Sequence, residues 1–241
     1  MNLLRRESSM LAEDVVSGTS GIEDVRVVLV PPFTSLDVVA ARIKGTRVEL
    51  GAQNVSWEEY GELTGEVSAP MLKDSGCGWV IVGHSERRAV FGETEAMIGN
   101  KIRACLKSGL VPIMCVGESQ EEKQQGKTER VVEAQIVNSL VGIELEGPEF
   151  LVIAYEPVWA IGTGENPHPD EVELVHNLIR DSLERKFGLI AQEMCLLYGG
   201  SVNVENIRGL LSPDNVDGVL VGGASLNADA FNKIVSIAGE I

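Results

Sequence analysis

Short runs of apolar residues recur along the chain, and segments with helical periodicity separate them. Within each run the apolar residues follow one another almost without interruption, and most are Val, Ile or Leu. Such uninterrupted runs are typical of strands in a parallel sheet that is covered on both faces. We predict seven strands, at residues 25–30, 46–52, 79–83, 111–117, 150–155, 195–200 and 217–223.

Between the predicted strands, apolar residues recur at helical spacing, and several of these segments follow Thr, Ser, Asp or Pro, as helix starts require. The clearest helices are predicted at residues 95–108, 128–141, 170–187 and 227–238. The chain also opens on a helical pattern, whose buried face is predicted at Leu3, Leu4, Met10, Leu11, Val15 and Val16. Helix and strand therefore alternate throughout the sequence.

Parallel sheets whose strands alternate with helices either stay open or close into a barrel of eight units. Seven strands that follow an initial helix correspond to eight strand–helix units from which the first strand is missing. We therefore predict an α/β fold, a (β/α)8 barrel with its first strand missing and seven strands visible. A single domain over residues 1–241 is expected, because no linker or low-complexity segment interrupts the alternation.

Composition narrows the class of protein. Of the 241 residues 44% are hydrophobic, and no apolar run approaches the roughly 18 residues that a membrane span needs. The formal net charge of −16 argues against nucleic acid as a partner, because phosphate backbones are bound by excess Lys and Arg. The four cysteines lack the paired spacing of a zinc site or redox dithiol, and the three histidines form no ligand cluster. We expect a cytoplasmic protein that uses no metal and contacts no membrane.

Two polar residues follow apolar runs at the strand ends, where parallel barrels carry their catalytic groups. His84 follows the third run, and an imidazole there can exchange protons or donate a hydrogen bond to a carbonyl oxygen. Glu156 follows the fifth run, where a desolvated carboxylate can act as a general base. Taken alone, the histidine can also be structural and the glutamate a salt-bridge partner.

The segments after three strands add a candidate lid and a candidate anion site. Behind Glu156, Gly162 and Gly164 can act as pivots, while Trp159 and Ile161 supply apolar cover. Glycine pairs follow the last two strands, where barrels commonly bind phosphate through backbone N–H groups. These two segments contain Gly199, Gly200 and Ser201, and Gly222, Gly223 and Ser225. Turns also use glycine, so it is the occurrence of two pairs that favours a phosphate site.

The segments GAQN, GHSERR, CVGE, AYEPVWAIGTG, YGGSV and LVGGASL resemble the triosephosphate isomerase family in order and spacing, over nearly the whole chain. The resemblance implies a TIM barrel and an enzyme of glycolysis and gluconeogenesis that needs no cofactor. That enzyme interconverts dihydroxyacetone phosphate and D-glyceraldehyde 3-phosphate through an enediolate. The resemblance implies that Glu156 moves the proton between two carbons and that neutral His84 polarises the carbonyl. Under a lid of residues 157–166, the implied phosphate contacts are the amides of Gly162, Ser201, Gly222 and Gly223.

The family is usually a homodimer, and the loop from Gln53 to Pro70 matches the segment that enters the neighbouring subunit. By the same resemblance, Thr64 approaches the partner's active site.

Tyr198 matches the tyrosine that holds the family's closed lid by bonding a backbone N–H, and the alignment places Pro167 at that N–H. Proline has no N–H group. We therefore expect lid closure in this chain to depend more on Ser201 and the substrate phosphate.

The family begins with a strand that ends in Asn-Trp-Lys-Met-Asn, and Met1 and Asn2 match the last two letters. No visible strand ends in Asn-x-Lys, so Glu86, whose counterpart pairs with that lysine, loses this partner. We expect Met1 to be an internal methionine rather than a true truncation, and we expect impaired activity of this 241-residue chain. The alternative is a catalytically dead barrel that keeps the phosphate site as a binding module or subunit.

Overall fold

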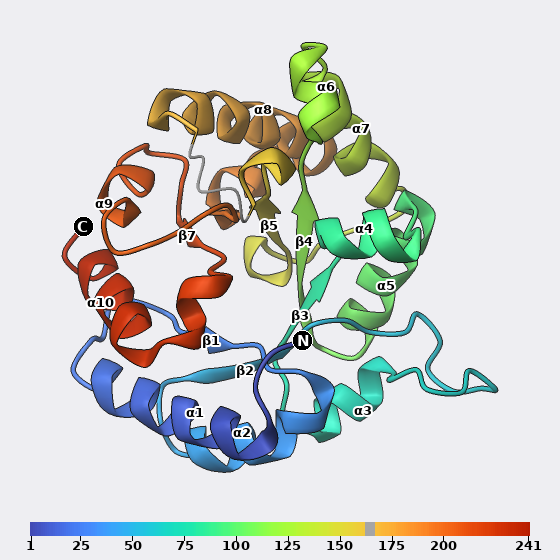
Figure 1. Cartoon of the computed structure of the whole chain (residues 1–241). Coiled ribbons are helices and arrows are strands. Elements are labelled where there is room, and N and C mark those ends of the chain that lie inside the picture. The colour runs from blue at the N-terminus through green and yellow to red at the C-terminus, as the bar shows by residue number, and fades with distance from the viewer. Residues whose placement is uncertain (162–166) are drawn as a thin grey trace.

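In the computed structural model, which describes residues 1–161 and 167–241, seven parallel strands form one curled sheet (Figure 1). Their order in the sheet equals their order in the chain, so each strand pairs with the next one. The strands are β1 (Val28–Leu29), β2 (Glu49–Ala52), β3 (Trp79–Val82), β4 (Val111–Val116), β5 (Val152–Tyr155), β6 (Leu196–Tyr198) and β7 (Gly218–Val219). The prediction of seven parallel strands is confirmed.

The two edge strands are shorter than the apolar runs that predict them. Within the described residues β1 pairs with β2 alone, and β7 pairs with β6 alone. A strand extends as far as its ladder of hydrogen bonds, so one neighbour supports less of it than two. The central strand β4 has neighbours on both sides and covers most of its predicted run.

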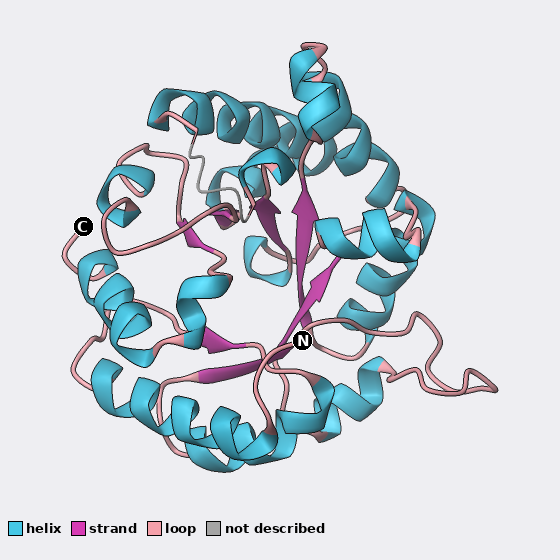
Figure 2. Cartoon of the chain, viewed as in Figure 1, coloured by secondary structure: helices cyan, strands magenta, loops and turns pink. Residues whose placement is uncertain are grey.

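Helices surround the sheet (Figure 2). They are α1 (Arg5–Thr19), α2 (Leu36–Ile43), α3 (Ala69–Asp74), α4 (Ser85–Phe91), α5 (Glu95–Lys107), α6 (Gln120–Gln124), α7 (Thr128–Ser139), α8 (Pro169–Phe187), α9 (Ile207–Leu210) and α10 (Ala228–Ala238). Short 3-10 helices are η1 (Phe33–Ser35), η2 (Pro148–Phe150), η3 (Val158–Ala160), η4 (Gly188–Glu193) and η5 (Gly223–Leu226). The four clearest predicted helices correspond to α5, α7, α8 and α10. None of the helices in the described part of the chain is long and apolar enough to cross a membrane.

The predicted buried face of the first helix is wrong in part. The buried residues of α1 are Ser8, Ala12, Val15 and Thr19. Leu4 and Met10 are exposed, while Leu11 and Val16 are only partly buried. Small residues carry this face because α1 packs between α2 and α10, and the Ser8 hydroxyl is hydrogen-bonded to Ser35 Oγ at 3.2 Å.

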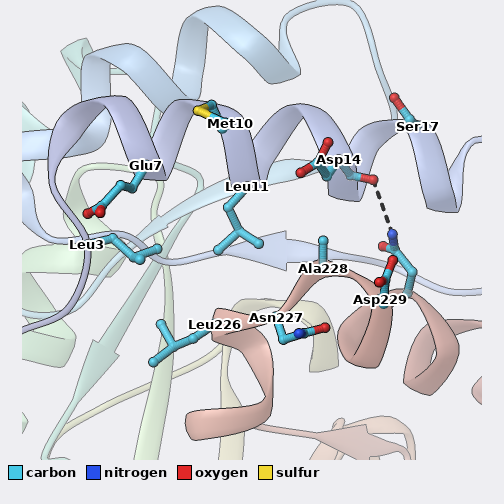
Figure 3. Close-up of a pocket in the computed structure, with 11 residues that line it drawn as sticks. Leu3, Glu7, Met10, Leu11, Asp14, Ser17, Leu226, Asn227, Ala228 and Asp229 are labelled. Atoms are coloured by element: carbon cyan, nitrogen blue, oxygen red, sulfur yellow. Dashed lines mark hydrogen bonds between the residues drawn. The ribbon is translucent and has the colours of Figure 1, made fainter.

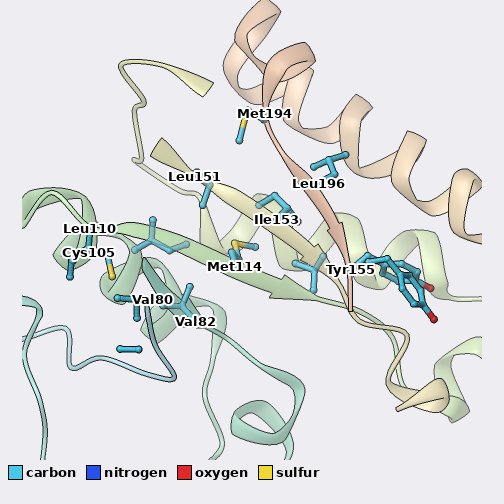
Figure 4. Close-up of a cluster of buried hydrophobic side chains, with 14 of the residues drawn as sticks. Val80, Val82, Cys105, Leu110, Met114, Leu151, Ile153, Tyr155, Met194 and Leu196 are labelled. Atoms are coloured by element: carbon cyan, nitrogen blue, oxygen red, sulfur yellow. The ribbon is translucent and has the colours of Figure 1, made fainter. Parts of the chain in front are cut away.

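The central strands are buried on both faces, which explains why their sequences are apolar without alternation. Val80, Val82, Met114 and Ile153 belong to the core between the sheet and the helices (Figure 4). The residues that alternate with them form a second core on the opposite face: Trp79, Ile81, Ile113, Cys115, Val152 and Ala154. Because all strands are parallel, their carboxyl ends meet at one end of this double-sided core.

Candidate active site

The structure brings His84 and Glu156 together at the carboxyl end of the sheet. His84 follows β3, Glu156 follows β5, and β4 lies between these strands. His84 Nε2 lies 3.0 Å from Glu156 Oε1, and the backbone N–H of Ser85 donates to Glu156 Oε2 at 3.0 Å. Glu156 is only 2% exposed, so these two donors bind its carboxylate where water has little access.

Two glycines allow the chain to pack closely around Glu156. The N–H of Glu156 donates to the carbonyl of Val116 at 2.7 Å, and a Cβ on the next residue, Gly117, would lie 1.7 Å from the carbonyl oxygen of Glu156. A Cβ on Gly199 would lie 2.9 Å from Glu156 Cγ. A larger residue at either position would therefore displace the carboxylate. This packing role of Gly199 is one that the glycine pattern alone does not reveal.

His84 is also the N-cap of α4, which fixes the tautomer of its neutral ring. Its Nδ1 accepts a hydrogen bond from the N–H of Glu86 at 3.3 Å, so the proton of the neutral ring is on Nε2, facing Glu156. Burial lowers the pKa of His84, but the hydrogen bond and the charge of Glu156, with a further contribution from Glu86, outweigh it. The pKa of His84 therefore lies above its ordinary value.

Glu118 holds the segment that follows Glu156. Its side chain accepts hydrogen bonds from Tyr155 Oη at 3.2 Å and from Trp159 Nε1 at 2.9 Å, and its carbonyl accepts from the N–H of Val158 at 3.1 Å. Glu118 is buried, so these donors satisfy its oxygens where water has little access. This glutamate ends the CVGE motif, and the sequence alone predicts no role for it. Its position directly after the fourth apolar run was the signal that could have selected it.

The candidate anion residues are described only in part. Ser201 Oγ donates to the carbonyl of Ala160 at 2.6 Å, which links the loop after β6 to the segment after Glu156. Gly222 and Gly223 are exposed at the start of η5. Gly162 lies outside the described residues. Tyr198 is fully buried, and its hydroxyl has no hydrogen-bond partner in the described part of the chain.

Thr64 and Glu86 both lie at the surface. Thr64 is exposed in the loop between β2 and α3, which stands out from the rest of the chain (Figure 1). The Glu86 carboxylate lies 3.9 Å from His84 Nδ1.

A cavity of about 610 Å³ lies elsewhere, between α1 and the start of α10 (Figure 3). Leu11, Asp14 and Asp229 are among the residues that line it, and none of the candidate site residues does. Imidazole next to a buried carboxylate is a stronger indication of chemistry than cavity size, so we place the candidate active site at His84 and Glu156. Among the described residues, no three His, Cys, Asp or Glu side chains gather as a metal site would require.

Comparison with known proteins gives one consistent result. The sequence profile described as triosephosphate isomerase matches residues 1–238. The triosephosphate isomerase of Dictyoglomus thermophilum is 46% identical over 230 residues, which cover 95% of this chain and 92% of that protein. The enzyme of Rhodopirellula baltica is 46% identical over 239 residues, covering 99% and 94%. A solved structure of triosephosphate isomerase from Bartonella henselae superimposes with a TM-score of 0.90 at 37% identity, covering 98% and 94%. The predicted TIM-barrel fold is thereby confirmed.

We predict that Glu156→Gln lowers the pKa of His84, because it removes the negative charge that favours the imidazolium. Glu86→Gln is the matched control, and it should lower that pKa less because the Glu86 side chain is 79% exposed. An NMR titration of the His84 ring measures both pKa shifts. The signals of this ring are identified by their absence from the spectrum of His84→Gln. Equal shifts in the two variants, or no shift in Glu156→Gln, would contradict the electrostatic account.

Proposed function

The chain belongs to the triosephosphate isomerase family and is an isomerase enzyme of glycolysis, and we propose that Glu156 and His84 catalyse its reaction. The substrate is a phosphorylated triose, and the reaction interconverts dihydroxyacetone phosphate and D-glyceraldehyde 3-phosphate. The observation that carries the assignment of residues is the 3.0 Å contact between His84 Nε2 and Glu156 Oε1 at the carboxyl end of the sheet. A general base and a hydrogen-bond donor for a carbonyl oxygen are thus available in one place.

In the proposed mechanism, Glu156 takes a proton from the carbon beside the substrate carbonyl and returns it to the neighbouring carbon. His84 donates its Nε2–H to the carbonyl oxygen while negative charge develops there. It then relays a proton from the neighbouring hydroxyl to that oxygen, so that the carbonyl and the hydroxyl exchange places. The contact between the two side chains opens to admit the substrate. As the carboxylate moves away from the ring, the charge that raises the pKa of His84 is removed, which disfavours the imidazolium form.

We propose that the backbone N–H groups of Ser201, Gly222 and Gly223 bind the phosphate. The support is their place after β6 and β7, where barrels commonly bind phosphate, and the link from Ser201 to Ala160. Through that link, phosphate binding and the position of the segment after Glu156 are coupled. Gly162 remains part of this proposal by resemblance. Exclusion of water by that segment would protect the enediolate from loss of phosphate.

Turnover by these 241 residues is proposed to be lower than it would be with a cation facing the enediolate. Among the described residues, the ionic contacts of His84 are with Glu156 and Glu86. In this part of the chain, no lysine side chain forms an ion pair with His84, Glu156 or Glu86. One preorganised donor to a developing oxyanion contributes on the order of 3 kcal/mol.

A cytoplasmic location is also part of the proposal. All four cysteines are free thiols, and those of Cys77, Cys105 and Cys115 are buried. Free thiols are typical of reducing compartments.

We further propose a homodimer through the loop from Gln53 to Pro70. The base of this loop is held in place, because Gln53 Nε2 donates to the carbonyl of Val30 at 2.9 Å and Lys101 Nζ donates to Asn54 Oδ1 at 2.7 Å. Its outer part carries exposed apolar side chains. They include Trp57, Tyr60 and Leu63. A firmly held loop with an apolar tip is suited to insertion into a second subunit.

Glu156→Gln and His84→Gln should each lower kcat by about 10²- to 10⁴-fold, the range expected for loss of general acid–base catalysis. Glu173→Gln and His168→Gln, at exposed positions on and before α8, are the matched controls and should keep the parent's kcat. A coupled assay that follows D-glyceraldehyde 3-phosphate measures all four. If the parent binds a phosphate analogue but gives no turnover, the chain is a binding module and the proposed mechanism is wrong.

The double variant Tyr60→Asp and Leu63→Asp should sediment as a monomer, because it places charge on the apolar tip of the loop. Leu189→Asp changes an exposed apolar residue in η4, outside the loop, and should leave the dimer intact. Sedimentation velocity distinguishes the two. A parent chain that is itself monomeric at micromolar concentration would rule the dimer out.

A further inference from the structure

We infer that Arg88 is a positioning residue for the isomerisation. It attaches the turn that carries His84 to the end of the neighbouring strand, β4. The inference rests on the proposed function of His84. Arg88 lies on α4, one helical turn after His84, and its side chain is 15% exposed.

The guanidinium joins two strand ends through backbone carbonyls. Its Nε donates to the carbonyl of Gly83 at 2.7 Å, and its Nη2 donates to the carbonyl of Cys115 at 3.0 Å. Gly83 follows β3 and Cys115 lies in β4, just beyond the paired residues Val82 and Met114. The donors of arginine form a rigid planar fork, so two bonds from one group fix the distance between the two strand ends.

The bond to Gly83 controls the peptide that leads into His84. Gly83 has φ +68°, the left-handed conformation that glycine adopts without strain, and there the chain turns from β3 into α4. The carbonyl held by Arg88 belongs to the same planar peptide as the nitrogen of His84. Loss of this bond would free that peptide to rotate, and the imidazole would move with it.

An ion pair holds the guanidinium itself. Nη1 donates to Glu95 Oε2 at 2.6 Å, and the same oxygen accepts from Ser139 Oγ on α7 at 3.1 Å. Arg88, Cys115 and Glu156 are among the residues that line one small cavity, so the guanidinium lies near the proposed general base. Arg88 is thus bonded to the turn before His84, to β4, and to α5 through Glu95.

The test compares Arg88→Met with Arg180→Met. Arg180 is a matched control, since it also has little exposed surface, donates to two backbone carbonyls, those of Ala191 and Met194, and pairs with Asp217. Both variants should lower the melting temperature. A misplacement of about 1 Å can cost on the order of a hundredfold in rate. We therefore expect kcat to fall about 10- to 100-fold in Arg88→Met, with KM changing less than about threefold. The kcat of Arg180→Met should not fall in this way.

Arg88→Lys provides a second variant that keeps the charge but cannot reach both carbonyls with a planar fork, and it should recover only part of kcat. A kcat of Arg88→Met within about threefold of the parent, or an equal loss in Arg180→Met, would make Arg88 merely structural. If the parent itself shows no turnover, the proposed function fails, and the NMR signals of the His84 ring still decide this inference. They should shift in Arg88→Met and stay unchanged in Arg180→Met, and unchanged signals in both would overturn it.

Discussion

The carboxylate of Glu156 is almost completely buried, and a buried carboxylate must receive hydrogen bonds to remain charged. Its donors are the N–H of Ser85 and the imidazole of His84, which both come from the turn after β3. Its own backbone is bonded to β4 through Val116. The carboxyl ends of β3, β4 and β5 must therefore lie at the same level of the sheet. Gly117 must lack a side chain, because a Cβ there would collide with the carbonyl oxygen of Glu156.

Hydrogen bonds from outside the site hold the same strand ends. Arg88 joins the carbonyl of Gly83, which follows β3, to the carbonyl of Cys115, which lies in β4. Glu118 accepts from Tyr155 and Trp159 on either side of Glu156. The proposed catalytic pair thus lies between two charged residues that are buried or nearly so. Arg88 is satisfied by backbone carbonyls and the Glu95 carboxylate, and Glu118 by aromatic and backbone donors.

Much of this could be predicted from the sequence, for physical reasons. Strands buried on both faces are apolar at every position, as Trp79 to Val82 illustrate, so the runs located all seven strands. Parallel strands bring their carboxyl ends together, so polar residues that directly follow the runs, His84 and Glu156, were expected to meet.

The remaining features depend on partners that are distant in the sequence. The lengths of β1 and β7 follow from having one neighbour each, which no local pattern encodes. The buried face of α1 follows from its close packing against other helices, so small residues such as Ser8 and Ala12 form it instead of Met10. Arg88 resembles any helical arginine in the sequence, because its carbonyl acceptors belong to the ends of two strands.

In the proposed mechanism, His84 acts as a neutral hydrogen-bond donor once ligand separates it from Glu156. The ¹⁵N spectrum of the His84 ring at pH 7, with and without 2-phosphoglycolate, tests this claim most directly. This small carboxylate carries a phosphate, so its charges resemble those of the enediolate. The account predicts a ring with one proton, on Nε2, in the complex. A ring protonated on both nitrogens in the complex would contradict it.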